Sequence, residues 1–125
     1  MMKIAYYLEN KTIANLDLSN PELGNPGCGG TEYLFVAAPY YLAKNFSEKY
    51  EVHLIANVID KLPSKLSIHQ ALDTYSAIRK AKEINADIFI YRPKHKENKS
   101  VINLIDSLKV KTIGWAHITP SPPIA

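Results

Sequence analysis

Apolar and polar residues alternate along this chain in blocks of two kinds, short β-prone runs and longer stretches with helical spacing. Runs of β-branched and aromatic residues predict strands, and they lie at residues 3–8, 51–57, 66–69, 87–91 and 111–116. Apolar residues repeating at intervals of three and four predict helices, and they lie at residues 31–46, 73–84 and 99–108. The two kinds of element follow one another through most of the chain.

Strands that alternate with helices predict a parallel sheet with helices on both faces. The run DIFIY at residues 87–91 is apolar almost throughout, as expected of a strand covered on both sides. Right-handed crossover connections favour the strand order 3-2-1-4-5. The sequence therefore predicts an α/β fold, a Rossmann-like, doubly wound and mainly parallel sheet. We expect one such domain over residues 3–118 and a proline-rich tail over residues 119–125.

Single residues add detail to the predicted helices. Pro39 lies inside the first helix, where it removes a backbone hydrogen bond and predicts a kink or an earlier helix end. Asp73 is placed to cap the second helix. The third helix is expected to turn its apolar positions inward, namely Val101, Ile102, Leu104, Ile105 and Leu108.

The segment between the first strand and the first helix is long, and glycines gather at its end. An irregular connection of about two dozen residues is uncommon in a compact domain and is usually functional or mobile. Gly24, Gly27, Gly29 and Gly30 permit unusual backbone angles and a close approach to a ligand. A helix that starts after such a stretch offers unpaired N–H groups to an anion. The alternative is a flexible turn capped by Thr31, with Glu32 in the first helical turn.

The carboxyl ends of the strands predict where a ligand binds. In an open parallel sheet the crevice lies outside these ends, near the point where the strand order reverses. Glu9 and the long loop follow the first strand, Arg92 follows the fourth, and His117 ends the fifth. Arg92 suits a phosphate or carboxylate, or simply begins a solvated basic run. His117 could donate a hydrogen bond to a sugar hydroxyl or a phosphate, or could be structural.

Several other functions lack their motifs in this sequence. There is no GK[ST], which excludes a Walker P-loop. The glycine stretch lies about twenty residues beyond the first strand and has Glu32 where a dinucleotide fold needs Gly or Ala. A receiver-like signalling domain needs paired acids after the first strand, which Glu9 and Asn10 do not supply. His53 and His69 fall in or near predicted strands and are interpreted as structural.

Composition and charge change this picture little. Hydrophobic residues make up 46% and charged residues 22%, as in ordinary globular proteins. The net charge of +3 is too weak to indicate a nucleic-acid partner, although it tolerates an anionic ligand or an acidic membrane surface. Cys28 is the single cysteine, and no metal-ligand spacing appears. Without a long apolar run or a signal-peptide pattern, we expect a cytoplasmic protein, with a peripheral place at the inner membrane face as an alternative.

The glycine stretch and the fifth strand together resemble a known family. The segments KIAYYLE, NPGCGGTEYLFVAAPYYLAK and IGWAHITPSP resemble the N-terminal domain of GT-B-fold retaining glycosyltransferases, of the type called group 1 or family 4. GGTE matches the G-G-x-E element of that family. WAH matches its strand that ends in a histidine at the interdomain cleft. The resemblance extends from about Lys3 to Pro120.

The resemblance implies an enzyme that moves a sugar from a nucleotide-sugar donor to an acceptor such as a cell-surface glycan or glycolipid. Such enzymes retain the anomeric configuration and need neither a metal nor a cofactor. Their N-terminal domain mainly holds the acceptor. By this resemblance Gly29 and Gly30 would approach the donor diphosphate and His117 would contact the donor sugar, while Glu32 would contact a ligand or shape the loop.

The chain also departs from the family pattern. A second, C-terminal domain binds most of the nucleotide in the family and carries an E-x₇-E element, which these 125 residues do not contain. We therefore expect a truncated domain that is inactive alone and needs that domain as its partner. The alternative function is a non-catalytic module that binds a phosphate or nucleotide, or that regulates a separate catalytic chain.

Overall fold

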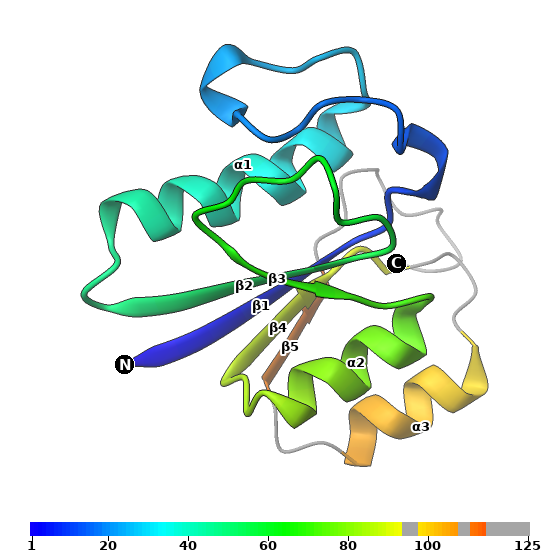
Figure 1. Cartoon of the computed structure of the whole chain (residues 1–125). Helices are drawn as coiled ribbons and strands as arrows, with labels where there is room; N and C mark the ends of the chain where they lie inside the picture. The colour runs from blue at the N-terminus through cyan, green and yellow to red at the C-terminus, as the bar shows by residue number, and fades with distance from the viewer. Residues whose placement is uncertain (94–97, 108–110, 115–125) are drawn as a thin grey trace, which may run out of the picture.

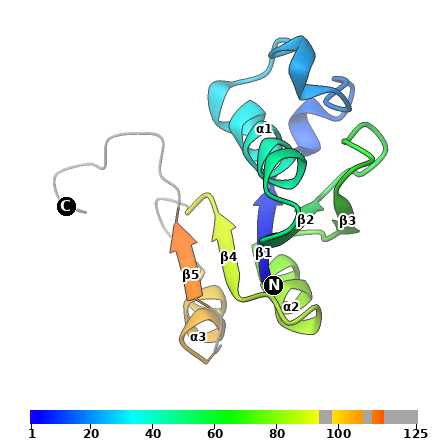
Figure 2. The ribbon, with the colours of Figure 1, turned by 90° about the vertical axis from the view of Figure 1, so that its left-hand side faces the viewer.

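A computed structural model describes residues 1–93, 98–107 and 111–114, and its centre is a five-stranded parallel sheet. The strands follow the order β3-β2-β1-β4-β5, with bounds β1 Met2–Leu8, β2 Tyr50–Ala56, β3 Ser67–Gln70, β4 Ile88–Tyr91 and β5 Lys111–Gly114. The helix α1 (Gly30–Asn45) covers one face, and α2 (Thr74–Glu83) and α3 (Lys99–Ser107) cover the other (Figure 1, Figure 2). The predicted Rossmann-like α/β fold and its strand order are confirmed.

The sheet separates two hydrophobic clusters. Successive side chains of a strand point to opposite faces, so Leu54 and Ile55 of β2 enter different clusters. Leu54 packs with Phe35 of α1, and Ile55 packs with Ala77 and Ile78 of α2. All five side chains are at most 1% exposed. Full burial of a Leu, Ile or Phe side chain contributes about 1.5–3 kcal/mol, which fixes both helix layers against the sheet.

The helix α1 continues through Pro39 as far as Asn45, so an earlier helix end is wrong. The Pro39 ring is among the fully buried side chains, and the neighbouring Tyr40 is buried as well. Burial of the proline ring in the core offsets the backbone hydrogen bond that it removes. The helix closes with a hydrogen bond of 2.9 Å from the Phe46 N–H to the Leu42 carbonyl.

The predictions for the other two helices are partly confirmed. Asp73 caps α2, where its Oδ1 accepts a hydrogen bond of 2.8 Å from the Ser76 N–H. Val101 of α3 is buried as expected. Ile102 is 45% exposed, so its predicted inward position is wrong. Because α3 packs mainly against α2, it buries a narrower stripe than its sequence pattern suggests.

The long connection between β1 and α1 is an ordered part of the domain. It contains two short 3-10 turns, Lys11–Ile13 and Pro21–Leu23. Asn10 and Asn57 are both buried and hold its start against the end of β2. The Asn10 N–H donates to Asn57 Oδ1 at 2.9 Å, and the Asn57 N–H donates to Asn10 Oδ1 at 3.1 Å. Leu18 enters the α1-side cluster and is 3% exposed.

Candidate functional site

A cleft of about 320 Å³ opens at the carboxyl edge of the sheet. Its volume falls at the small end of the range for ligand pockets, about 300–1,000 Å³. The lining comes from the ends of β1, β2 and β4 and from the starts of α1 and α2, through Tyr7, Glu9, Lys11, Thr12, Glu32, Asn57, Leu72, Asp73 and Arg92. The strand order reverses between β1 and β4, so the cleft lies where the parallel-sheet rule predicts a ligand.

Two of the predicted site residues meet at this cleft. Arg92 Nη1 lies 3.5 Å from Glu32 Oε1, and this ion pair joins the end of β4 to the first turn of α1. The Arg92 side chain is 46% exposed and that of Glu32 is 24% exposed. Such a pair contributes little to stability, about 0–1 kcal/mol. Arg92 can therefore exchange the Glu32 carboxylate for a ligand anion at small cost.

Gly29 and Gly30 form the start of α1. Gly29 is the N-cap residue and Gly30 the first helical residue, so the interpretation of Thr31 as the cap is wrong. Glu32 then occupies the third helical position, from which an acidic side chain reaches back toward the cap. A Cβ built onto Gly29 would collide with the Glu32 carboxylate. The absence of a side chain at Gly29 therefore lets Glu32 fold over the helix start, where its negative charge is favourable.

Asn25 fills part of the predicted anion cradle. Its Oδ1 accepts hydrogen bonds from the N–H groups of Gly27 and Cys28, each at 2.9 Å, and its Nδ2 donates to the Cys28 carbonyl at 2.8 Å. The φ angle of Gly27 is +116°, which only glycine adopts readily. An amide oxygen of the chain itself thus takes the place of an anion at these two N–H groups. What remains of the cradle lies at Gly29 and Gly30.

Cys28 is not placed for nucleophilic chemistry. Burial, and after it the negative charge of Glu32, raise the pKa of the Cys28 thiol above its ordinary value. A thiol attacks only as the thiolate, and a raised pKa keeps Cys28 protonated at neutral pH. Its Sγ lies 3.3 Å from Asn25 Oδ1, which agrees with a role in the packing of the loop.

The floor of the cleft is a hydrogen-bond network around Asn57. Its Nδ2 donates to Tyr7 Oη at 3.0 Å and to the Ala71 carbonyl at 2.9 Å. Because Tyr7 Oη accepts this bond, its own proton is available to a ligand. Burial, helped by the Glu9 and Asp73 carboxylates and opposed by the Asn57 bond, raises the pKa of Tyr7 to about 12. The phenol therefore stays protonated at neutral pH and can act as a donor.

Charge in the cleft is mixed. The lining carries the carboxylates of Glu9, Glu32 and Asp73 and the cations of Lys11 and Arg92, and Arg92 is paired with Glu32. Because these carboxylates outnumber the cations and like charges repel, an anion is favoured only where it replaces Glu32 at Arg92. Carboxylate acceptors together with the Tyr7 phenol, the Thr12 hydroxyl and the Lys11 ammonium match ligands whose groups both donate and accept hydrogen bonds.

His117 lies outside the described residues, so its role stays a prediction, as does that of the tail at residues 119–125. The strand β5 that leads to it is described as far as Gly114 and pairs there with Tyr91 of β4. Gly114 also lies close to Pro93, because a Cβ built on it would stand 3.2 Å from the Pro93 ring. The end of β5 therefore lies at the same edge of the sheet as Arg92.

Tyr7 and Asn57 are cleft residues that the sequence reasoning missed. Asn57 follows β2 directly, so the carboxyl-edge rule could have found it had the rule been applied to the second strand as well. Tyr7 lies within β1 and is only 2% exposed. Nothing in a β-prone run distinguishes a tyrosine that packs in the core from one whose hydroxyl reaches a cleft.

Among the described residues, no group of three His, Cys, Asp or Glu side chains is arranged to hold a metal ion. Within the same residues, no helix combines the length and apolar character needed to cross a membrane. Comparison of the chain with models of known families, with curated proteins and with solved structures gave no match.

Proposed function

We propose that this chain is the N-terminal, acceptor-side part of a GT-B-fold glycosyltransferase, which moves a sugar from a nucleotide-sugar donor to a glycan or glycolipid acceptor. The observation that supports it most is the cleft at the reversal of strand order, lined by both hydrogen-bond donors and acceptors. Sugar hydroxyls donate and accept at once, so a sugar ring can pair with both kinds of group. Such pairing avoids the cost of buried polar groups left without partners.

In this proposal the cleft binds the acceptor. Tyr7 donates through its hydroxyl, and the exposed Glu9 accepts from a sugar hydroxyl. Leu72, which is 70% exposed, provides an apolar wall beside these groups. A few polar groups that fix orientation, next to an apolar surface, are typical of small-ligand sites.

The donor would lie across the start of α1. Gly29 and Gly30 carry no side chains of their own, so a diphosphate that displaces the Glu32 carboxylate could approach the helix start closely. Arg92 would exchange Glu32 for a phosphate oxygen, a contact for which guanidinium geometry is well suited. A second GT-B domain would supply the opposite wall and most of the nucleotide contacts, as the proposed membership of that family implies.

Titration of the isotope-labelled chain tests the proposal. Oligosaccharide acceptors should shift the amide signals of Glu9, Asn57 and Leu72. Millimolar UDP- and GDP-sugars should shift those of Gly29 and Gly30. If glycans shift amides elsewhere and leave the cleft unmoved, the acceptor site is wrong.

The same titration distinguishes the proposed function from the alternative one. A non-catalytic nucleotide-binding module would respond at Gly29, Gly30 and Arg92 to nucleotides that carry no sugar, with an affinity as high as for the nucleotide sugars. It would also give no response to any glycan. The ion pair of Arg92 with Glu32 is the observation that keeps this alternative open, because it places an exchangeable cation beside a helix start.

A further inference from the structure

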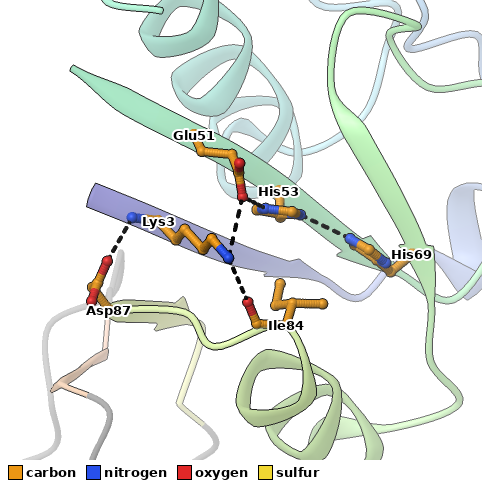
Figure 3. A network of polar contacts seen from close by, with 6 residues as sticks. All are labelled: Lys3, Glu51, His53, His69, Ile84 and Asp87. Atoms are coloured by element: carbon orange, nitrogen blue, oxygen red, sulfur yellow. Dashed lines mark hydrogen bonds and ion pairs between the residues drawn. The ribbon is translucent and has the colours of Figure 1, made fainter. Parts of the chain in front are cut away.

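Three side chains, Glu51, His53 and His69, form a continuous chain of hydrogen bonds between β2 and β3 (Figure 3). His53 Nε2 lies 2.7 Å from Glu51 Oε2, and His53 Nδ1 lies 2.9 Å from His69 Nε2. His53 is buried, with 8% of its surface exposed. Because His53 stands opposite Ser67 in the register of the two strands, His53 and His69 are diagonal neighbours on one face of the sheet.

The contact between the two rings accommodates one proton. A hydrogen bond needs a donor and an acceptor, and a charged imidazolium has only donors. When His53 is charged, it donates to Glu51 and to a neutral His69. When His53 is neutral, the Glu51 bond keeps its proton on Nε2, and His69 donates instead. If both rings are charged, two N–H groups face each other and the hydrogen bond is lost.

The charges around His69 oppose a second proton. Burial lowers the pKa of His69, and the positive charges of His53 and of Lys80 on α2 lower it further. Glu83, also on α2, acts in the opposite direction and is outweighed. The ring therefore stays neutral at neutral pH and takes up its proton only in more acidic solution than an ordinary histidine.

Glu51, at the other end of this series of hydrogen bonds, is held in place. Lys3 Nζ lies 3.9 Å from Glu51 Oε2 and donates to the Ile84 carbonyl at 3.3 Å, at the end of α2 (Figure 3). The hydrogen bond from His53 lowers the pKa of Glu51 below its ordinary value. Glu51 thus remains a carboxylate while His69 titrates, so the change in charge falls on the contact between the two rings.

The strand β3 leads directly into the cleft. It has four residues and pairs only with β2 in the described sheet, so side-chain bridges matter for its attachment. Leu72 and Asp73 follow it after Ala71 and line the cleft. Asn57 Nδ2 bonds the carbonyls of Ala71 and Leu72 and also Tyr7 Oη. A displacement of β3 is therefore transmitted to both the rim and the floor of the cleft.

We propose that protonation of the His53–His69 pair controls how firmly β3 is held against β2 beside the cleft, and we call this pair the latch. While the rings share one proton, they hold β3 against β2. When His69 takes a proton while His53 is charged, two N–H groups face each other, the bond between the rings is lost, β3 loosens, and Leu72 and Asp73 move. The latch acts on the shape of the cleft in the free protein, so it does not depend on which ligand the cleft binds and can be tested apart from the proposed function.

Amide hydrogen exchange of the unliganded chain tests the latch. Exchange is measured at about pH 7.5 and at about pH 5, a range that spans histidine titration. The rates are corrected for the intrinsic exchange rate at each pH. We expect the β3 amides to lose protection by about tenfold, as for one lost hydrogen bond to a charged group. The amides of β1 should keep theirs. Equal protection of β3 at both pH values would overturn the proposal.

Two variants distinguish the effect of protonation from a general weakening of the attachment of β3. His69→Gln keeps a neutral hydrogen-bonding side chain that cannot take up a proton, so β3 should stay protected at both pH values. Ile68→Val is the matched control, because it removes one methylene from the same strand and no titratable group. In this control the β3 amides should be less protected at the start and should still lose protection between the two pH values. An unchanged step in His69→Gln would contradict the latch.

Imidazole signals of the wild-type chain give a measurement that needs no variant. The amides of Leu72 and Asp73 should shift with the same midpoint as the His69 ring, because the loss of one bond moves them. That midpoint should lie below the ordinary value for histidine. If these amides follow a different midpoint, or do not shift while His69 titrates, the latch does not reach the cleft and the proposal fails.

Discussion

Asn57 connects several parts of the cleft through one residue. Its side chain bonds Tyr7 and Ala71, and it exchanges backbone-to-side-chain bonds with Asn10. Buried amides of this kind are expensive to leave without partners, since the cost falls on every group that they satisfied. At the scale of single residues, the cleft is held in shape by this neutral network, while its charges decide what it binds.

Replacement of Asn57 by alanine should therefore destabilise the whole domain. Asn57→Ala leaves the buried Asn10 N–H without its acceptor, and we expect the free energy of unfolding to fall by about 1–3 kcal/mol. Urea unfolding measures the change. Asn15→Ala, at an exposed position in the same connection, should stay within about 0.5 kcal/mol of the wild type. Equal effects of the two variants would show that the network contributes nothing.

Tyr7→Phe separates binding from stability. The change removes only the phenol oxygen, and Asn57 keeps the Ala71 carbonyl as an acceptor. Loss of one donor to the ligand should weaken acceptor binding about three- to tenfold, equivalent to roughly 1 kcal/mol. Calorimetric titration with an oligosaccharide measures it. The control is Tyr75→Phe, which removes the same atom from a tyrosine that is 36% exposed and outside the cleft lining; it should bind like the wild type.

At the scale of elements, the two kinds of glycine before α1 have different reasons to be glycine. Gly27 has φ of +116° and open space around its Cβ position, so its backbone angle is the constraint. Gly29 has ordinary extended angles, and the Glu32 carboxylate is the constraint there. We expect Gly27→Ala to cost about 1–2 kcal/mol through backbone strain.

Gly29→Ala is the matched comparison. Only a flexible carboxylate must move, so its free energy of unfolding should stay within about 1 kcal/mol of the wild type. Thermal unfolding of the two variants side by side measures the difference. If Gly29→Ala proved the more damaging of the two, Glu32 would be held far more rigidly than its exposure suggests.

The attachment of β3 predicts a pH dependence of stability. Because the folded state lowers the pKa of His69 from its ordinary value of 6.5, the unfolded chain takes up the proton first as the pH falls. Stability should therefore decline as the pH falls through 6.5 and level off once folded His69 is also charged. Urea midpoints measured against pH should follow this curve in the wild type. In His69→Gln the decline should be smaller.

Much of the element layout is predictable from local patterns, and the exceptions have physical reasons. The strand order follows from the handedness of crossovers, and Glu32 and Arg92 meet because both lie at one edge of the sheet. The continuation of α1 through Pro39 depends on burial of its ring, which sequence spacing does not reveal. The pairing of His53 with His69 depends on the register of two strands, which no local signal encodes.

At the scale of the whole molecule, the proposed sugar transfer would need a site that is closed to water. The described residues supply one wall, from β1, β2, β4 and the starts of two helices. In a GT-B enzyme the opposite wall comes from the second domain. The proposed function therefore predicts that these 125 residues alone transfer no sugar.

A transfer assay with labelled nucleotide sugars measures this. Activity should be absent from the chain alone and should appear when a GT-B C-terminal domain is joined to it. Replacement of Gly30 by a bulky residue in the joined protein should then reduce the rate, because in the proposed function the diphosphate would approach the helix start. Measurable transfer by the chain alone would contradict the need for a second domain.

The central position of β1 has a consequence for how this chain folds as it is synthesised. The strand β1 precedes both of its partners in the sequence, pairing on one side with β2 and on the other with β4, and its Lys3 N–H bonds an Asp87 carboxylate 84 residues away. Contacts so distant in sequence form late. The half-sheet of β1, β2 and β3 with α1 can assemble first, leaving one edge of β1 unpaired until β4 emerges. While that edge of β1 is unpaired, the chain is open to mispairing with other strands.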